Sequence, residues 1–440
     1  MMSHESSDDL SRLPDGPPAM PAALLGAADR NLTGRALAGR GTSLVLLLVV
    51  GAAVALALGV TVHNRSTEEI VRKSPPRYEQ LIRFWIHRGY FRHGGLWIRR
   101  RGLQHAYSPP VGEEPAKWAY RTSSMGYLQL GHILERIYYG ATGRYSPQLM
   151  VLHSQALVWL SSALLGLLAM RLALRIGAPG FHALLAGISC QIVHATFPAT
   201  LNYYWEVYYT TVAPIFLILF LLLSEKFLVL DGRDVSRRVG ICRALCLFAL
   251  FYIDPAPTIS FILTYLLCRA VLGYGLPSGR RVLKTIVLPV AAAVLLFAAQ
   301  LLWVKLRFPE LTFIGSGLMF RTGFDGSTQL YSDHWNLLFS RYRGFWDCLS
   351  WPSLFVAGVG STALLAVLYH RVSQLRIPVF MVLALLGMYV PFTFLFSQGV
   401  TIHPYAYDSY LVMPLILSLL AILPAIIDQC HDKGALSIRG

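Results

Sequence analysis

Charged side chains are scarce in this sequence. Only 14% of its 440 residues are Asp, Glu, Lys or Arg, whereas 55% are hydrophobic. Soluble globular domains carry about 25% charged residues, so the composition excludes an ordinary soluble protein. The charges that are present sum to +15. In a soluble chain this excess would suggest nucleic acid as the partner, but the apolar bulk indicates a membrane, and we expect no nucleic-acid partner.

Cysteine pairs and acidic metal motifs are also missing. The chain has six cysteines, but none forms a Cys-x-x-Cys pair, and their spacing implies no disulfide framework. No Asp-x-Asp pair marks a site for a hard divalent cation. The cofactor is therefore unknown at this stage, and a divalent cation bridging carboxylates stays an open alternative.

Long apolar runs are what the sequence has in abundance. A hydrocarbon core about 30 Å thick needs around 20 apolar residues per helix. The first run is too long, and too far into the chain, to be a signal-peptide core. The runs predict an all-α, polytopic bundle of about ten transmembrane helices, near residues 42–62, 149–170, 179–198, 207–224, 241–254, 257–273, 285–304, 352–369, 377–396 and 408–427.

Basic residues fill one set of short connections and are absent from the other. If the N-terminus is cytoplasmic, the short inner loops hold thirteen Lys and Arg. The short outer connections, around 199–206, 254–257 and 397–407, hold none. Lys and Arg in short loops mark the cytoplasmic side. This asymmetry predicts a multi-pass protein of a bacterial inner (cytoplasmic) membrane with a cytoplasmic N-terminus.

The segment Asp254-Pro255-Ala256-Pro257 interrupts the apolar run at 241–273. It leaves two alternatives, one kinked helix or a hairpin of two short helices. A single crossing would move all basic residues downstream of it to the outside, whereas a hairpin keeps them inside. Proline also lacks an amide donor and disfavours the helical region for the residue before it. We therefore expect a hairpin that turns at the outer surface.

The same topology divides the chain into parts. Residues 1–41 form a disordered cytoplasmic tail, 42–428 the transmembrane domain, and 429–440 a second cytoplasmic tail. Two large loops, 63–148 and 305–350, face outward, and we expect amphipathic helices in them.

In the first loop, apolar residues fall at helical spacing between arginines. This pattern predicts an amphipathic helix lying in the outer headgroup layer. Its apolar residues are Tyr78, Leu81, Ile82, Trp85 and Ile86.

Polar residues at the predicted outer helix ends are the candidates for a functional site. On this topology they face one side and converge over the mouth of the bundle. A carboxylate at the edge of the hydrocarbon is costly and usually has a role. The predicted catalytic residues are Glu68, Glu69 and Asp254, and the predicted substrate-binding residues are Glu206, Arg341, Arg343, His403 and Asp408.

These residue types fit the transfer of a sugar from a lipid-linked donor. A carboxylate would take the proton of the acceptor hydroxyl as general base. Arginine, with its fork of donors, would hold the departing phosphate. The expected partners are membrane lipid, a polyprenyl-phosphate-linked sugar and a glycan or lipid acceptor.

Three features carry a resemblance to a known family. They are the acidic pair Glu68 and Glu69 after the first helix, the segment Tyr252-Ile253-Asp254, and the closing segment His403-Pro404-Tyr405-Ala406-Tyr407-Asp408-Ser409-Tyr410-Leu411. In these features and in its layout over about 42–428, the chain resembles the GT-C superfamily of polytopic glycosyltransferases. The resemblance implies a glycosyltransferase that uses a lipid-linked sugar, with a base or metal ligand at Glu68 or Glu69.

Two other functions fit the same layout. An O-antigen polymerase or ligase would work through the later outer loop, where Arg341 and Arg343 lie. A membrane scaffold or lipid-linked sugar transporter would need no catalytic acid. The helix centres hold almost no Asp, Glu, Lys or Arg, which disfavours ion coupling. We interpret the polar stripe of His182, Gln191 and His194 as interhelical hydrogen bonding, with a proton path as the alternative.

Overall fold

A computed structural model describes most of the second half of the chain and parts of the first. The described residues are 85–87, 89–91, 98–99, 118–119, 129–197, 200, 209–229, 236–307, 309, 312–313, 350–368, 373–395 and 404–437. All of them belong to one compact unit, Leu47–Gly440. The predicted first helix at 42–62 and the predicted tail at 1–41 lie outside the described residues.

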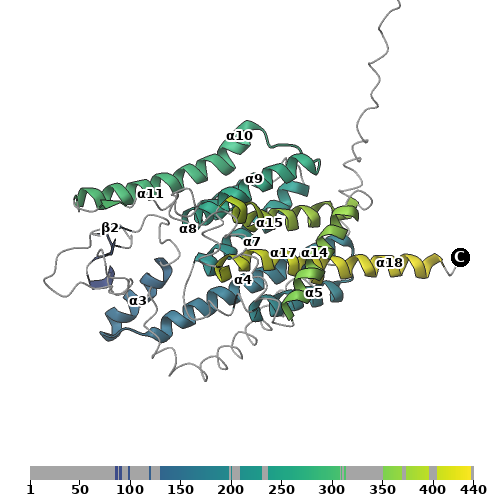
Figure 1. Cartoon of the computed structure of the whole chain (residues 1–440), viewed down its shortest axis with the longest axis horizontal. Helices are drawn as coiled ribbons and strands as arrows, with labels where there is room; N and C mark the ends of the chain where they lie inside the picture. Colours follow the sequence, from purple (N-terminus) through teal and green to yellow (C-terminus); the bar gives the residue numbers. More distant parts are fainter. Residues whose placement is uncertain are drawn as a thin grey trace, which may run out of the picture. The chain divides into compact units, whose positions relative to one another are not determined.

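The described residues are predominantly helical, as the sequence predicts (Figure 1). Among the described residues, helices occupy the predicted apolar runs from 149–170 to 408–427. They are α3 (Gln129–Thr142), α4 (Pro147–Ile176), α5 (Gly180–Thr196), α7 (Tyr209–Val229), α8 (Arg237–Ile253), α9 (Pro255–Val271), α10 (Gly279–Val282), α11 (Leu288–Arg307), α14 (Ser350–Leu368), α15 (Arg376–Leu395), α17 (Pro404–Leu417) and α18 (Leu423–Ser437). Short π-helical turns, η3 (Leu283–Val287) and η5 (Ser418–Ile422), and the 3-10 turn η4 (Ser373–Leu375) connect some of them.

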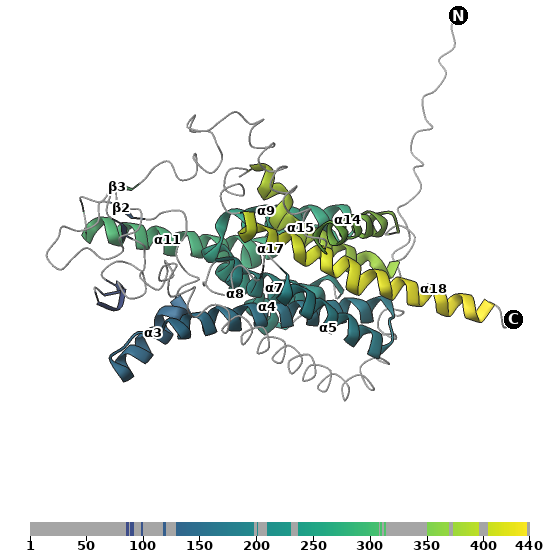
Figure 2. The same ribbon diagram turned by 60° about the horizontal axis from the view of Figure 1, so that its bottom comes forward.

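The ends of α4 show how local sequence bounds a long apolar helix. The Ser146 hydroxyl accepts a hydrogen bond from the Leu149 amide at 3.2 Å, and Pro147 fills the first turn, where no amide donor is needed. At the other end, Gly177 has a φ of +104°, a left-handed conformation that glycine adopts without strain. Helix α5 begins at Gly180, only a few residues after α4 ends at Ile176. Because the connection is so short, the two helices run antiparallel beside each other (Figure 2).

The break at Asp254 separates two antiparallel helices, α8 and α9. Arg243 of α8 donates a hydrogen bond to the Tyr265 hydroxyl of α9 at 3.1 Å, and these two residues are equally far from Asp254 along the chain. In one continuous helix they would be about 33 Å apart. The structure therefore has the predicted hairpin and not a kinked helix.

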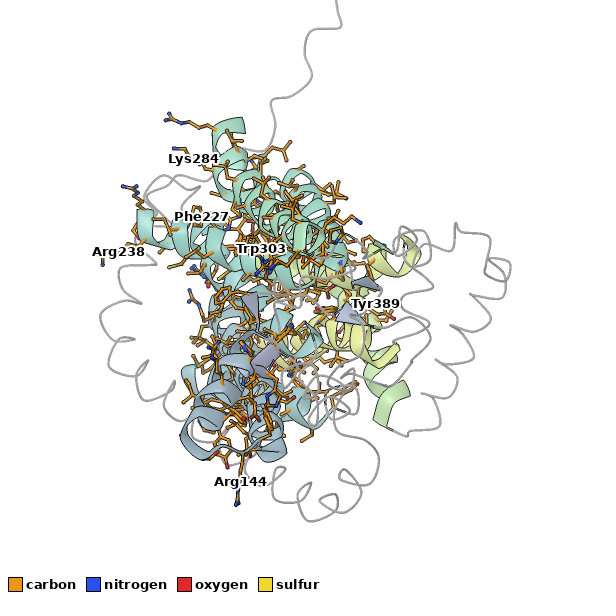
Figure 3. The ribbon with its side chains drawn as sticks, turned by 90° about the vertical axis from the view of Figure 1, so that its left-hand side faces the viewer. Arg144, Phe227, Arg238, Lys284, Trp303 and Tyr389 are labelled. Atoms are coloured by element: carbon orange, nitrogen blue, oxygen red, sulfur yellow. The ribbon has the colours of Figure 1, made fainter. Side chains whose placement is uncertain are left out.

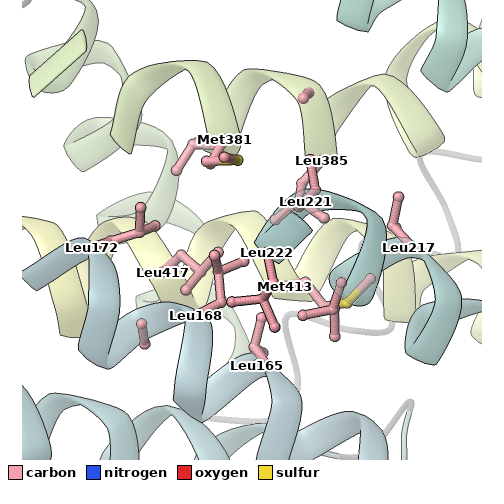
Figure 4. Close-up of a cluster of buried hydrophobic side chains, with 14 of the residues drawn as sticks. Leu165, Leu168, Leu172, Leu217, Leu221, Leu222, Met381, Leu385, Met413 and Leu417 are labelled. Carbon is pink, nitrogen blue, oxygen red and sulfur yellow. The ribbon is translucent and has the colours of Figure 1, made fainter. Parts of the chain in front are cut away.

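Leucine and methionine side chains from several helices fill the centre of the bundle. They interlock in one buried cluster around α4 (Figure 4), consistent with the close packing of protein interiors. The labelled members are Leu165, Leu168 and Leu172 of α4, Leu217, Leu221 and Leu222 of α7, Met381 and Leu385 of α15, and Met413 and Leu417 of α17.

Several helices are apolar enough to lie in a membrane. Within the described residues, the spans Leu152–Ile176, Gly279–Arg307 and Tyr410–Cys430 have the length and composition to cross one. Shorter apolar helices cover Thr211–Glu225, Pro255–Val271 and Arg376–Phe392. Large apolar side chains also point outward, especially along α9 and α11, where lipid tails would be a compatible solvent. The chain is therefore a helical membrane protein.

Two layers of polar contacts between helices mark the two ends of the bundle. In one layer, Tyr410 of α17 donates to the Asp254 carboxylate at 2.9 Å. In the other, His182 Nδ1 lies 2.8 Å from Asp428 Oδ2, and Gln429 donates to the Ile176 carbonyl. The helical stretch from Tyr410 to Asp428 rises about 27 Å, which is close to the hydrocarbon thickness of about 30 Å. We call these layers the Asp254 end and the Asp428 end.

Three two-residue strands join the two predicted outer loops. The sequence pattern does not predict these strands. Strand β1 (Ile98–Arg99) pairs antiparallel with β2 (Trp118–Ala119), and β2 pairs parallel with β3 (Thr312–Phe313). The indole of Trp303 in α11 also donates to the Phe91 carbonyl at 2.7 Å. Backbone pairing and this side-chain bond hold the first loop against the second loop and α11.

Trp85 packs against other parts of the protein, and the headgroup location of its helix stays a prediction. Its side chain is fully buried, and its ring meets the rings of Tyr90 and His132 edge-on, at 5.2 and 5.6 Å between centroids. His132 belongs to α3, so the indole packs between segments of the protein and away from lipid. The predicted helix residues Tyr78, Leu81 and Ile82 lie outside the described residues.

Gly387→Ala is expected to lower the free energy of unfolding by about 1–3 kcal/mol, because overpacked contacts must open. A Cβ at Gly387 of α15 would lie 2.5 Å from Cβ of Thr264 in α9, and that atom is fixed by its backbone. Thermal unfolding of the purified protein measures the loss. Gly360→Ala in α14 is the matched control, since its Cβ would meet nothing within 4 Å. Equal melting temperatures for Gly387→Ala and wild type would contradict this packing.

Candidate functional site

The carboxylate of Asp254 is the predicted site residue that the structure describes in full. It is 5% exposed and follows α8 directly, where its amide still donates to the Leu250 carbonyl at 2.9 Å. Pro255 begins α9 in the next position, and the Thr258 hydroxyl donates to the Asp254 carbonyl at 2.6 Å. These bonds hold the backbone of the turn, so the carboxylate has a fixed place between the two helices.

Tyr410 brings the last helical segment to this carboxylate. Its side chain is fully buried, and its hydroxyl donates to Asp254 Oδ2 at 2.9 Å. Burying a carboxylate is costly unless hydrogen bonds replace its water. The bond joins the hairpin turn to the closing segment 403–411, which the sequence analysis expects at the same end of the bundle. Sequence reasoning did not select Tyr410 itself, although that segment contains it.

The other predicted site residues have little or no described geometry. Asp408 lies within α17, two positions before Tyr410, but only its backbone is described. The remaining predicted residues lie outside the described part of the chain, and their roles stay predictions. They are Glu68, Glu69, Glu206, Arg341, Arg343 and His403.

The predicted polar stripe divides into three different environments. His194 of α5 is buried, and its Nδ1 pairs with the Ser162 hydroxyl of α4 at 2.8 Å, which is the interhelical bond that we expect. His182 lies at the Asp428 end, paired with Asp428, and not inside the bundle. Gln191 is buried, and its amide has no hydrogen-bond partner among the described residues. The stripe is therefore not one continuous chain of hydrogen bonds in the described structure.

An ion cluster with a buried carboxylate and two partly exposed arginines joins α4 and α7, and sequence reasoning missed it. The Glu225 side chain is 2% exposed. Arg175 Nε donates to its Oε1 at 2.8 Å, and Arg171 Nη2 lies 2.6 Å from Oε2. This second contact is an ion pair without hydrogen-bond alignment. The two arginines are near the end of α4 that precedes Gly177, so the cluster belongs to the Asp428 end of the bundle.

Aromatic rings gather in the first loop beside α3. Tyr90 stacks on His132 at 4.8 Å between ring centroids, and Tyr139 stacks on Tyr145 at 4.7 Å. The Tyr145 hydroxyl also pairs with His87 Nε2 at 2.5 Å. These ring contacts pack the centre of the loop against α3.

Stability of this aromatic cluster is expected to fall in acid. Burial, with a smaller contribution from the Arg136 charge, lowers the pKa of His132 to about 4. An unfolded histidine has a pKa near 6.5, so between about pH 6.5 and pH 4 the unfolded chain binds more protons than the folded one. Stability present above pH 6.5 is lost as the pH falls through this window, by up to about 3 kcal/mol.

Limited proteolysis of 129–145 between pH 8 and pH 4 measures this loss. His132→Gln should flatten the pH dependence, since the amide does not titrate. His87→Gln, in the same aromatic cluster, is the control and should leave the pH dependence in place. An unchanged acid profile in His132→Gln would contradict the assignment.

Among the described residues, no three His, Cys, Asp or Glu side chains group closely enough to hold a metal ion. The fold and the buried carboxylate define a helical membrane protein with one polar junction at the Asp254 end. Comparisons with protein-family models, curated proteins and solved structures find no match.

Proposed function

We propose that this chain is a membrane glycosyltransferase of GT-C type. It transfers a sugar from a polyprenyl-phosphate-linked donor to a glycan or lipid acceptor of the cell envelope. In this proposal the protein crosses a bacterial inner membrane about ten times, with a cytoplasmic N-terminus, and transfer takes place at the outer face.

The observation that carries the proposal is the buried Asp254 carboxylate held by Tyr410. The hairpin turn and the start of the last helix supply the two residues. An acid placed at the edge of an apolar bundle is expensive, and such residues are usually functional. Helices α8 and α9, which flank the turn, contain no Asp or Glu. Asp254 is therefore the one acidic side chain that this hairpin supplies.

Asp254 would act as general base for the acceptor hydroxyl. Tyr410, by its bond to Oδ2, would fix the orientation of the carboxylate before the proton arrives. Glu68 and Glu69 stay the second candidates for this role. In the proposal, Arg341 and Arg343 hold the departing phosphate, and Glu206, His403 and Asp408 bind the sugar.

The arrangement of charge along the bundle supports the proposed orientation. Arg171 and Arg175 meet Glu225 near the Asp428 end of the bundle, away from the Asp254 junction. Basic residues in short loops favour the cytoplasmic side. The Asp254 end would then face outward, where the donor head group is presented.

Reconstitution tests the function directly. Purified protein in liposomes is given a polyprenyl-phosphate-linked radioactive sugar and an envelope extract as acceptor. We expect label in the acceptor and release of polyprenyl phosphate. Transfer of whole oligosaccharide repeats would favour an O-antigen polymerase or ligase, and movement of the donor across the bilayer without transfer would favour a transporter. Neither transfer nor movement from an intact, folded sample would overturn the proposal.

A further inference from the structure

Arg243 is a buried cation far from the Asp254 junction. It lies in the first half of α8, and its side chain is 4% exposed. Its guanidinium carbon sits over three aromatic rings, 4.6 Å from the centroid of Phe220, 4.8 Å from Phe227 and 5.4 Å from Tyr265. The charge is thus enclosed between α7, α8 and α9, where water has little access.

No carboxylate among the described residues pairs with this guanidinium. A second arginine, Arg269 of α9, is 7% exposed and close enough to Arg243 for the two cations to repel each other. Arg269 donates to the Gly275 and Tyr274 carbonyls at 3.1 and 3.3 Å. Two buried cations therefore share one corner without a described counter-ion, which is costly in a low dielectric.

The same corner has more hydrogen-bond donors than acceptors. Arg243 Nη2 donates to the Tyr265 hydroxyl at 3.1 Å, so the phenol serves there as acceptor and its own proton is left to donate elsewhere. Arg243 Nε is buried and has no partner among the described residues. Arginine has no acceptor atom, so Arg243 Nε and the Tyr265 hydroxyl both need an acceptor from outside the pair.

Cation–π contact explains only part of this arrangement. Aromatic faces attract a cation, but they do not accept the in-plane N–H bonds of a guanidinium. They also do nothing to reduce the repulsion between Arg243 and Arg269. An anion with several acceptor oxygens would satisfy the donors and neutralise the charge at once.

We propose that Arg243, Tyr265 and Arg269 form a phosphate-binding site in the half of the α8–α9 hairpin that lies away from the Asp254 turn. Phosphate matches this corner because its oxygens accept paired bonds from the fixed fork of arginine. The site would hold the phosphate of an anionic phospholipid or of a soluble phosphate compound. Its residues are about 16–22 Å of helical rise from Asp254, so the site is separate from the proposed sugar transfer.

The start of α8 and the cations around it would attract such an anion. Helix α8 has no acidic residue in its first turn, although acids are the stabilising residues there. That turn and the short helix α10 hold exposed cations instead, which are Arg237, Arg238, Arg280 and Arg281. Figure 3 shows Arg238, and Lys284 of η3, projecting away from the bundle. A cationic rim of this kind concentrates phosphate near the buried arginines.

Ligand-dependent melting of the purified, delipidated full chain tests the site. The probes are phosphatidylglycerol, phosphatidylcholine and inorganic phosphate at constant ionic strength, with native mass spectrometry to count bound molecules. We expect one phosphate species to raise the melting temperature of wild type. Arg243→Gln and Arg269→Gln should need at least tenfold more of it for the same shift. Arg144→Gln removes an exposed cation just after α3, outside the proposed site, and should need less than threefold more.

The pattern of responses also identifies the source of the phosphate. A response to phosphatidylglycerol alone indicates an anionic lipid, and a response to inorganic phosphate indicates a soluble ligand; both support the site. If Arg243→Gln does not fold, Arg243→Lys keeps the charge but loses the fork, and the same tenfold loss is expected. No response to any probe, or an equal response in wild type and both buried-arginine variants, would overturn the proposal.

Discussion

Asp254→Asn is expected to reduce transfer of a lipid-linked sugar by about 10²- to 10⁴-fold, the usual contribution of a general base. The substitution keeps the size of the side chain and an oxygen that accepts the Tyr410 bond, which is 2.9 Å long in the wild type. It removes the negative charge and the ability to take a proton. Initial rates with saturating donor in liposomes measure the loss, and the melting temperature should stay within a few degrees of wild type.

Tyr410→Phe separates the role of the acid from the role of its partner. The ring keeps its place in the core, where Tyr410 is fully buried, but the carboxylate loses a donor. We expect a loss of about tenfold or less, because Asp254 can still accept a proton. The paired variant Glu68→Gln with Glu69→Gln provides the comparison. Full activity in Asp254→Asn together with loss in that pair would move the base to the first loop.

The positions of the helices were predictable because hydrophobic length and charge are local properties. Residues 149–170 are apolar enough to predict α4, and Ser146, Pro147 and Gly177 set its actual ends. The hairpin at Asp254 followed from two prolines and from the side on which basic residues must lie. Both predictions use local sequence properties and do not depend on which helices are in contact.

Contacts between distant segments were not predictable in this way. Two-residue strands at 98–99, 118–119 and 312–313 are too short to give a periodic pattern. Trp85 fitted an amphipathic helix equally well whether its apolar face met lipid or protein, and only the fold shows that it meets His132. Arg243 is one of the thirteen basic residues that the sequence assigns to short inner loops, but in the structure it lies within α8 and aromatic rings bury it. Burial of a charge depends on neighbours that the sequence does not specify.

The burial of Glu225 was likewise not predictable from the sequence. Removing its two arginine partners gives the largest change in stability that we expect. Replacing both Arg171 and Arg175 by Met is expected to lower the free energy of unfolding by about 3–5 kcal/mol, because it leaves a buried carboxylate unpaired. The Glu225 side chain is only 2% exposed, so water cannot replace the lost cations. Thermal unfolding in detergent measures the effect. Arg237→Met with Arg238→Met removes two exposed cations and should cost less than about 1 kcal/mol.

Adding Glu225→Leu to the Arg171 and Arg175 double variant should restore most of the stability. An apolar trio of similar volume avoids the desolvation cost that the ions bear, and such replacements are often neutral or stabilising. The rescue distinguishes an electrostatic penalty from lost packing, since the leucine adds no contact to the shortened α4 side chains. If the triple variant melts no higher than the double variant, the loss of stability comes from the missing arginine side-chain packing between α4 and α7. The ion cluster would then not be what stabilises this end of the bundle.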